Sequence, residues 1–128
     1  IVNMSSRSGI VGIPAGVAYA SSKAAVRNHT KSVALYCAER GLNVRCNSIH
    51  PATILTPMWE PMLGQGEQRE RALRELAREI PMKRLGTPAE VGQLVLFLAS
   101  EASSYITGGE FTIDGGLLAG SAATPPEE

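Results

Sequence analysis

The sequence predicts an α/β fold in which three short strands alternate with helices and form a parallel sheet. Apolar runs rich in β-branched residues recur along the chain, and segments with helical apolar spacing separate them. Strands that alternate with helices are joined by crossover connections, which make neighbouring strands parallel. The chain has 128 residues, enough for one domain. We place that domain over residues 1–118 and a flexible tail over residues 119–128.

The first half of the chain supplies two strands and the longest helix. Residues 1–5 form the first apolar, β-branched run, and a loop with three glycines follows it. Residues 18–40 have the spacing of a long helix, and residues 44–50 read as the second strand. The helix has one stripe at positions i, i+4, i+7 and i+11, formed by Val26, Thr30, Val33 and Cys37.

The second half supplies a long loop, two helices and the last strand. Residues 52–66 contain prolines and glycines without periodicity, so we predict an irregular loop. We expect residues 55–66 to be the most mobile internal segment. Helices follow over residues 67–80 and from Thr87, which begins a capping-box sequence. The last strand is predicted over residues 110–113.

A sheet of only three strands leaves its first strand with an unpaired edge. The sequence starts directly in the apolar run of that strand. Exposed edges of this kind are normally paired or covered. We therefore expect further strands of the same sheet to be encoded upstream of Ile1.

Composition argues against several kinds of partner. Lys plus Arg and Asp plus Glu each number 12, so the net charge is zero and no field of one sign attracts nucleic acid or an acidic membrane. No apolar run is long enough to span a bilayer. Cys37 and Cys46 lie outside any CxxC or Cys/His cluster, so we expect buried free thiols and no metal site. Free thiols favour a reducing compartment, and we expect a cytoplasmic protein.

Tyr19 and Lys23 are the residues with the clearest chemical meaning. On a helix they lie four residues apart on one face, so the phenol and the ammonium are neighbours. A neighbouring cation stabilises a phenolate, which would let Tyr19 exchange a proton near neutral pH. Alone, such a pair is more often the surface of an amphipathic helix. Ser6 adds context, because it follows the first strand at the carboxyl edge, where parallel sheets bind their ligands.

Several ordered motifs resemble the short-chain dehydrogenase/reductase family. In chain order they are Ile-Val-Asn-Met-Ser-Ser from Ile1, Tyr-Ala-Ser-Ser-Lys from Tyr19, Asn-Ser-Ile-His-Pro from Asn47, Arg-Leu-Gly-Thr-Pro from Arg84, Ile-Thr-Gly-Gly from Ile106 and Ile-Asp-Gly-Gly from Ile113. The resemblance extends to about residue 118 and includes bacterial hydroxysteroid dehydrogenases. It implies that the chain is the C-terminal half of a doubly wound parallel-sheet Rossmann fold, with three strands and flanking helices.

The resemblance implies a role for each catalytic position. Tyr19 matches the family's catalytic acid and base, and Ser6 matches the serine that orients the substrate carbonyl. Lys23 matches the lysine that favours the tyrosinate and binds the nicotinamide ribose beside the tyrosine. In isolation, Ser6 would read as a loop hydroxyl, but the motifs together favour the functional role.

The resemblance also implies a cofactor-binding loop after the second strand. Four residues match that loop, besides Tyr19 and Lys23: Pro51, Ala52, Ile54 and Thr56. Ala52 stands where the family usually has glycine, which is a small change in side-chain volume. Thr56 alone would read as a turn residue before a proline. His50 precedes the loop, and we interpret it as a structural residue at the strand end.

The implied reaction is hydride transfer between NAD or NADP and a secondary alcohol or ketone. Apolar residues after the loop suit a hydrophobic, ring-shaped substrate such as a steroid: Met58, Trp59, Met62 and Leu63. The glycine-rich turn that binds the pyrophosphate and the residue that selects NAD or NADP do not occur in this sequence. We therefore expect residues 1–128 alone neither to bind the dinucleotide usefully nor to turn over.

Two alternatives from other functional classes remain. The chain could be a non-catalytic fragment or pseudoenzyme that serves as an oligomerisation module, since the alanine-rich helix over residues 18–40 resembles the family's assembly helix. That resemblance implies a homo-oligomer, a dimer or a tetramer. A small nucleotide-binding regulator is a poorer interpretation, because the glycines that cradle phosphate are absent from the sequence.

Overall fold

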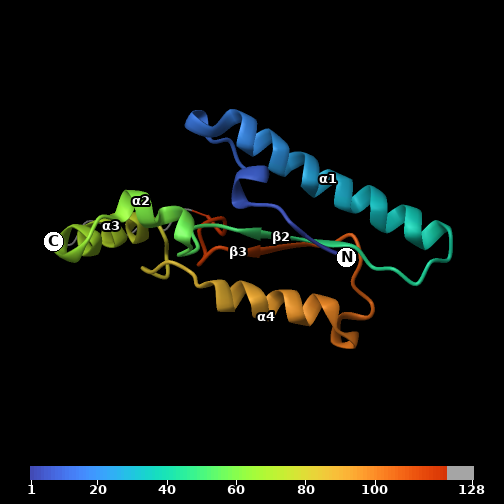
Figure 1. The fold of residues 1–128 in the computed structure, drawn as a ribbon. Coiled ribbons are helices and arrows are strands. Elements are labelled where there is room, and N and C mark those ends of the chain that lie inside the picture. The colour runs from blue at the N-terminus through green and yellow to red at the C-terminus, as the bar shows by residue number, and fades with distance from the viewer. Residues whose placement is uncertain (121–128) are drawn as a thin grey trace.

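The computed structural model describes residues 1–120 and shows a parallel sheet between helices (Figure 1). The strands are β1 (Val2–Met4), β2 (Asn47–Pro51) and β3 (Glu110–Ile113). The helices are α1 (Val17–Glu39), α2 (Glu60–Leu63), α3 (Gly66–Arg78) and α4 (Pro88–Ala99). Helix α1 lies on one side of the sheet and α4 on the other, while α2 and α3 lie beyond the carboxyl ends of the strands. The α/β fold class predicted from the sequence is confirmed.

The strands are ordered β1-β2-β3, and both pairings are parallel. Val2 is paired with Asn47, and Ser48 is paired with Glu110. The central strand is the most buried element, because Asn47 through His50 are all nearly inaccessible to solvent. This burial on both faces is typical of a parallel strand covered by helices.

Helix α1 attaches to the sheet through the stripe predicted from its sequence. Thr30 and Cys37 are buried there. The Thr30 hydroxyl donates to the Val26 carbonyl at 2.8 Å and accepts from the Asn3 amide at 3.0 Å, which connects the helix to β1. Cys37 and Cys46 are buried free thiols, as expected.

Two of the predicted boundaries were wrong. The second strand begins at Asn47 instead of residue 44, since the preceding Cys46 N–H donates to the Thr107 hydroxyl and not to a neighbouring strand. The segment over residues 52–66 is not wholly irregular. It contains a 3-10 helix, Pro57–Trp59, followed by α2. Each of these helices has a proline in its first turn, where a missing N–H costs nothing.

The start of α4 has the capping box that the sequence predicted. The Thr87 hydroxyl accepts from the Glu90 N–H at 3.3 Å, and the Glu90 carboxylate accepts from the Thr87 N–H at 2.8 Å. Arg84 also donates to this carboxylate, at 2.6 Å. Because of these donors, chiefly Arg84, the pKa of Glu90 is lowered to about 2.

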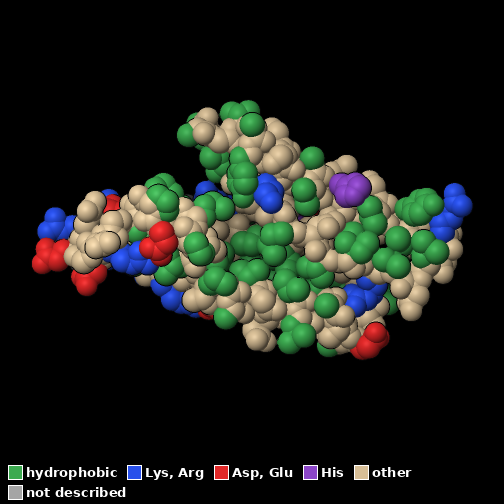
Figure 2. Space-filling view, viewed as in Figure 1, with side chains coloured by type: hydrophobic (Ala, Val, Ile, Leu, Met, Phe, Trp, Pro, Cys, Tyr) green, Lys and Arg blue, Asp and Glu red, His purple; other side chains and the backbone are tan. Residues whose placement is uncertain are grey.

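Strand β1 lies at an edge of the sheet, as the sequence predicted. Ile1, which precedes the strand, is 60% exposed, and Met4, its last residue, is 43% exposed. Figure 2 shows hydrophobic side chains gathered between α1 and α4, over the sheet. Among residues 1–120, no helix combines the length and apolarity needed to cross a membrane. Most of the tail predicted over residues 119–128 lies outside the described residues.

Candidate active site

One cavity of about 580 Å³ opens at the carboxyl ends of β1 and β2. Every residue that the sequence predicted for catalysis or cofactor binding lines it: Ser6, Tyr19, Lys23, Pro51, Ala52, Ile54 and Thr56. These residues come from the turn after β1, the first turns of α1 and the segment after β2. The fold therefore brings together two stretches of chain that are about 30 residues apart in the sequence.

Ser6 lies two residues after the end of β1 and caps a 3-10 helix, Arg7–Gly9. Its hydroxyl oxygen accepts from the Ser8 N–H at 3.1 Å. An oxygen that accepts this bond still has its own hydrogen to donate. Ser6 can therefore donate a hydrogen bond to a carbonyl or alkoxide oxygen in the cavity.

Gly9 lets the turn after β1 lie against α1. A Cβ atom at this position would stand 2.7 Å from the Lys23 carbonyl carbon, which is too close for any side chain. Beside it, the Ser5 hydroxyl donates to the Lys23 carbonyl oxygen at 2.8 Å. The close approach of Gly9 and the hydrogen bond from Ser5 fix the position of the Lys23 backbone relative to Ser6.

Tyr19 and Lys23 lie on one face of α1, as their spacing predicted. The Lys23 ammonium is 5.7 Å from the centre of the Tyr19 ring and donates to the Met4 carbonyl at 3.1 Å. That bond uses one of its three N–H groups and leaves the others for a ligand. Tyr19 is half exposed, and its hydroxyl makes no hydrogen bond within residues 1–120. The phenol is thus free to meet a substrate beside a positive charge.

The segment after β2 is held by backbone contacts to β3 and to the residues before α4. Ala52 N–H donates to the Ile113 carbonyl, and Ile54 forms an isolated parallel bridge with Gly86. Thr56 precedes the 3-10 helix at Pro57, but its hydroxyl does not cap that helix. The hydroxyl therefore remains able to bond a ligand amide. Ala52, at the position where the family usually has glycine, lines the cavity.

His50 is fully buried directly beneath the cavity. Its Nδ1 lies 3.3 Å from the Ser6 carbonyl oxygen, and its Nε2 lies 2.8 Å from the Ser48 hydroxyl. A carbonyl can only accept, so Nδ1 holds the proton and Nε2 accepts from Ser48. Burial lowers the pKa of His50, which keeps the ring neutral at pH 7. This geometry supports the interpretation of His50 as a structural residue that holds the backbone of Ser6.

The cavity also contains residues that the sequence analysis did not single out. Pro88 and Val91 reach it from the start of α4, and Arg7 and Ser8 reach it from the turn after β1. For Pro88 and Val91, the capping-box sequence at Thr87 indicated where the helix begins. The sequence did not indicate that the first turn of this helix would face the cavity.

The proposed apolar wall needs one correction. Met58 and Trp59 line the cavity, but Met62 and Leu63 do not. Leu63 is 1% exposed and belongs to the core, while Met62 is 62% exposed on the opposite face of the short helix α2. Adjacent positions of a helix point in different directions, which is why Leu63 can be buried while Met62 is exposed.

The chain is similar to a known protein family and to several known proteins. The protein-family model described as enoyl-(acyl carrier protein) reductase matches residues 1–118. Oxidoreductase UcpA of Escherichia coli K12 is 48% identical over 119 residues, which are 91% of this chain and 44% of that protein. The NADP-dependent (R)-specific alcohol dehydrogenase of Lentilactobacillus kefiri is 40% identical, over 93% of this chain and 45% of that protein.

Among solved structures, the ligand-free aldohexose dehydrogenase of Thermoplasma acidophilum superposes with a TM-score of 0.88 and 39% identity. The superposition covers 99% of this chain and 51% of that one. The chain thus spans about half the length of the proteins it matches, and it corresponds to their C-terminal part. The family match over nearly all described residues, together with this likeness of fold, shows that the chain belongs to the short-chain dehydrogenase/reductase family.

Proposed function

We propose that the chain is the catalytic part of an NAD- or NADP-dependent oxidoreductase that interconverts a secondary alcohol and a ketone. One observation carries this proposal: Ser6, Tyr19 and Lys23 line one cavity together with the segment after β2. Separate structural roles for these residues would not require them to meet. The alcohol dehydrogenase from Lentilactobacillus kefiri supports the same reaction class and the same type of cofactor.

The residues of this chain handle the proton and the orientation of the substrate. Ser6 donates a hydrogen bond to the substrate oxygen, and Tyr19 removes the hydroxyl proton during oxidation or returns it during reduction. Lys23 places its positive charge beside the Tyr19 ring, and its spare N–H groups suit ribose hydroxyls. A bound nicotinamide would take up or supply the hydride. Pro51, Ala52, Ile54 and Thr56 would hold its carboxamide end.

The apolar part of the cavity indicates the substrate class. Met58 and Trp59 offer a broad, flexible surface next to the polar residues. This combination suits a hydrophobic alcohol, and a fused-ring alcohol of the steroid type is the finer proposal. The choice between NAD and NADP belongs to residues that are not in this sequence.

We also propose that residues 1–128 alone are inactive and that the working protein is a cytoplasmic homo-oligomer, a dimer or a tetramer. The lining of the cavity has no glycine-rich turn that could bind a pyrophosphate. On α1, Leu35 and Tyr36 are 64% and 55% exposed, which supports a helix that packs on a second copy. The same exposed face is what an oligomerisation module without catalysis would have.

Substitution of Tyr19 by Phe separates these two functions. The protein, produced with any sequence that precedes Ile1 in its reading frame, is assayed with a panel of secondary alcohols while the absorbance of the reduced nicotinamide is followed. We expect Tyr19→Phe to lower turnover by about two to four orders of magnitude and to leave cofactor affinity nearly unchanged. Turnover within a few-fold of the parent protein would contradict the assignment. Absence of turnover in both proteins on every alcohol would favour the oligomerisation module.

A further inference from the structure

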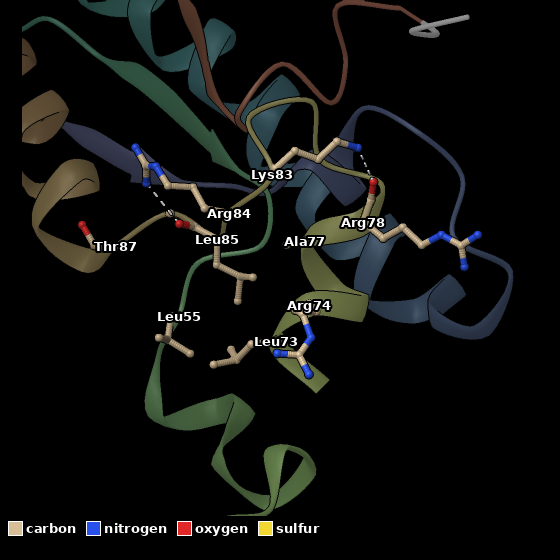
Figure 3. Close-up of a pocket in the computed structure, with 10 residues that line it drawn as sticks. Leu55, Leu73, Arg74, Ala77, Arg78, Lys83, Arg84, Leu85 and Thr87 are labelled. Carbon is tan, nitrogen blue, oxygen red and sulfur yellow. Dashed lines mark hydrogen bonds between the residues drawn. The ribbon is translucent and has the colours of Figure 1, made fainter. Parts of the chain in front are cut away.

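A second cavity, of about 490 Å³, lies between α3 and the segment that leads to α4 (Figure 3). Leu55, Leu73 and Leu85 point toward one another inside it. No residue lines both this cavity and the candidate active site. It is therefore separate from the space in which the proposed reaction takes place.

The two cavities are separated by one thin wall. Ile54 and Thr56 line the candidate active site, and the residue between them, Leu55, lines the second cavity. This alternation is that of an extended segment, in which successive side chains point to opposite faces. The Leu55 N–H donates to the Gly86 carbonyl at 2.9 Å, so the wall is fixed against the segment before α4.

The lining combines an apolar floor with basic charge. Four of its ten residues are basic and none is acidic: Arg74, Arg78, Lys83 and Arg84. Arg84 is already neutralised by the two oxygens of Glu90, at 2.6 and 3.0 Å. Arg74 has only a loose contact with Glu70, at 3.7 Å, and its side chain is 66% exposed. Figure 3 shows Arg74 beside Leu73, at the side of the apolar floor.

Lys83 adds to this charge at the C-terminal end of α3. It has the only positive φ, 56°, of any non-glycine residue among residues 1–120. In this conformation its ammonium donates to the Arg78 carbonyl at the end of α3, at 2.8 Å. The contact fixes a cation near the cavity and leaves two of its N–H groups free.

We propose that this second cavity binds an amphiphilic carboxylate, a molecule with one acidic head and an unbranched apolar tail. The three leucines remove the tail from water, and the basic side chains, Arg74 first, receive the head. An uncharged ligand would leave the basic side chains other than Arg84 without a use, and a small inorganic anion would leave the apolar floor exposed. The proposal does not depend on the oxidoreductase reaction, because it concerns binding alone.

The test is a calorimetric titration of the protein, produced with any sequence that precedes Ile1, with decanoate below its micelle concentration. Decan-1-ol supplies the tail without the charge, and acetate supplies the charge without the tail. We expect saturable binding of decanoate and at least ten-fold weaker binding of the other two probes.

Two arginines of α3 provide a matched pair of variants. Arg74 and Arg71 each have a glutamate partner one turn before them, at 3.7 and 3.9 Å, but only Arg74 lines the cavity. We expect Arg74→Gln to weaken decanoate binding about five-fold, with Arg74→Lys restoring most of it, and Arg71→Gln to leave it unchanged. Both side chains are exposed, so neither change threatens the fold.

Three results would overturn the proposal. The first is equal affinity for decanoate and decan-1-ol, since the charges would then have no role. The second is an equal effect of Arg71→Gln and Arg74→Gln, which would reduce the interaction to net charge. The third is loss of binding on Met58→Gln with no effect of Arg74→Gln, because Met58 lines only the candidate active site.

Discussion

The two ends of the sheet are built for different purposes. At the carboxyl end, the side chains of Ser6, Tyr19 and Lys23 line an open cavity and retain unused hydrogen-bonding groups. At the amino end, buried side chains use their hydrogen-bonding groups within the protein. Asn47, 1% exposed, donates to the Ile106 carbonyl at 2.9 Å and accepts from the Gly109 N–H at 2.9 Å.

Arg45 extends the network at the amino end. Its guanidinium donates to the Ser103 hydroxyl and the Ile106 carbonyl, at 3.0 and 3.2 Å, and to the Ser100 carbonyl at 3.0 Å. These bonds connect the entry to β2 with the turn after α4. Polar groups satisfied inside the protein stabilise its fold, whereas polar groups left open at a cavity stabilise a ligand. The comparison therefore predicts that changes at one end alter turnover and changes at the other alter stability.

The largest effect is expected at the carboxyl end, for Lys23→Met. The ammonium contacts the Tyr19 ring and has N–H groups left for the ribose, so both cofactor affinity and turnover should fall, turnover by about 100-fold or more. The free energy of unfolding should change by less than about 1 kcal/mol, because the bond to Met4 is exposed.

Steady-state kinetics, cofactor titration and urea denaturation measure these quantities. Lys31→Met is the control for turnover and cofactor affinity, since Lys31 lies on the same helix, outside the cavity. A Lys23→Met protein with the parent protein's cofactor affinity and turnover would remove Lys23 from the site.

The next largest effect is expected at the amino end, for Asn47→Ala. The change removes two hydrogen bonds, which leaves the Gly109 N–H without a partner and the Ile106 carbonyl with Arg45 alone, so it should cost about 1–3 kcal/mol of stability. Asn28→Ala, an exposed change on α1, should stay within about 0.5 kcal/mol. Urea denaturation compares the two. If Asn47→Ala lowered turnover per folded molecule as strongly as Lys23→Met, the two ends would not be separable.

The sequence predicted more of the carboxyl end of the sheet than of its amino end. At the carboxyl end the sequence predicted that Ser6, Tyr19 and Lys23 would lie together, because Tyr19 and Lys23 share a helix face and the motifs resembled a known family, but it did not indicate Val91 or Arg7. Arg45 and Asn47 were missed as structural residues, because their partners lie about 60 residues further along the chain. Contacts over this separation depend on how the turn before β3 folds back on β2, and local sequence patterns do not predict that. The mobility expected for residues 55–66 remains a prediction that hydrogen exchange can test.

His50 connects the buried centre to the carboxyl end, and substitutions there should have intermediate effects. His50→Ala removes the donor to the Ser6 carbonyl and the acceptor from Ser48, so we expect a loss of about 1–3 kcal/mol and a few-fold fall in kcat. Asn places an amide nitrogen where Nδ1 lies, so His50→Asn should restore most of kcat but only part of the stability. A purely structural His50 would instead show equal kcat, per folded molecule, in both variants.

The smallest effect is expected for the ion pair between α1 and β3, and it should depend on pH. Glu110 accepts from Arg27 at 2.6 and 3.0 Å, and Lys31 lies 2.8 Å away. These contacts, chiefly the hydrogen bonds from Arg27, lower the pKa of Glu110 to about 2. The Glu110 side chain is 23% exposed and that of Arg27 is 35% exposed, so screening by water reduces the stabilisation to about 1 kcal/mol.

Because the pKa of Glu110 is lower in the folded chain than in the unfolded one, this stabilisation is complete above about pH 4.5 and disappears as the pH falls to about 2. Glu110→Gln should therefore be less stable than the parent protein at pH 7 and equally stable near pH 2. His50, whose pKa burial lowers, acts in a separate window: its neutral ring becomes unfavourable as the pH falls below about 6.5, in both proteins alike. Thermal unfolding of the pair between pH 7 and pH 2 measures the difference. A gap that persisted unchanged at pH 2 would mean that Glu110 stabilises the amino end by its shape and not by its charge.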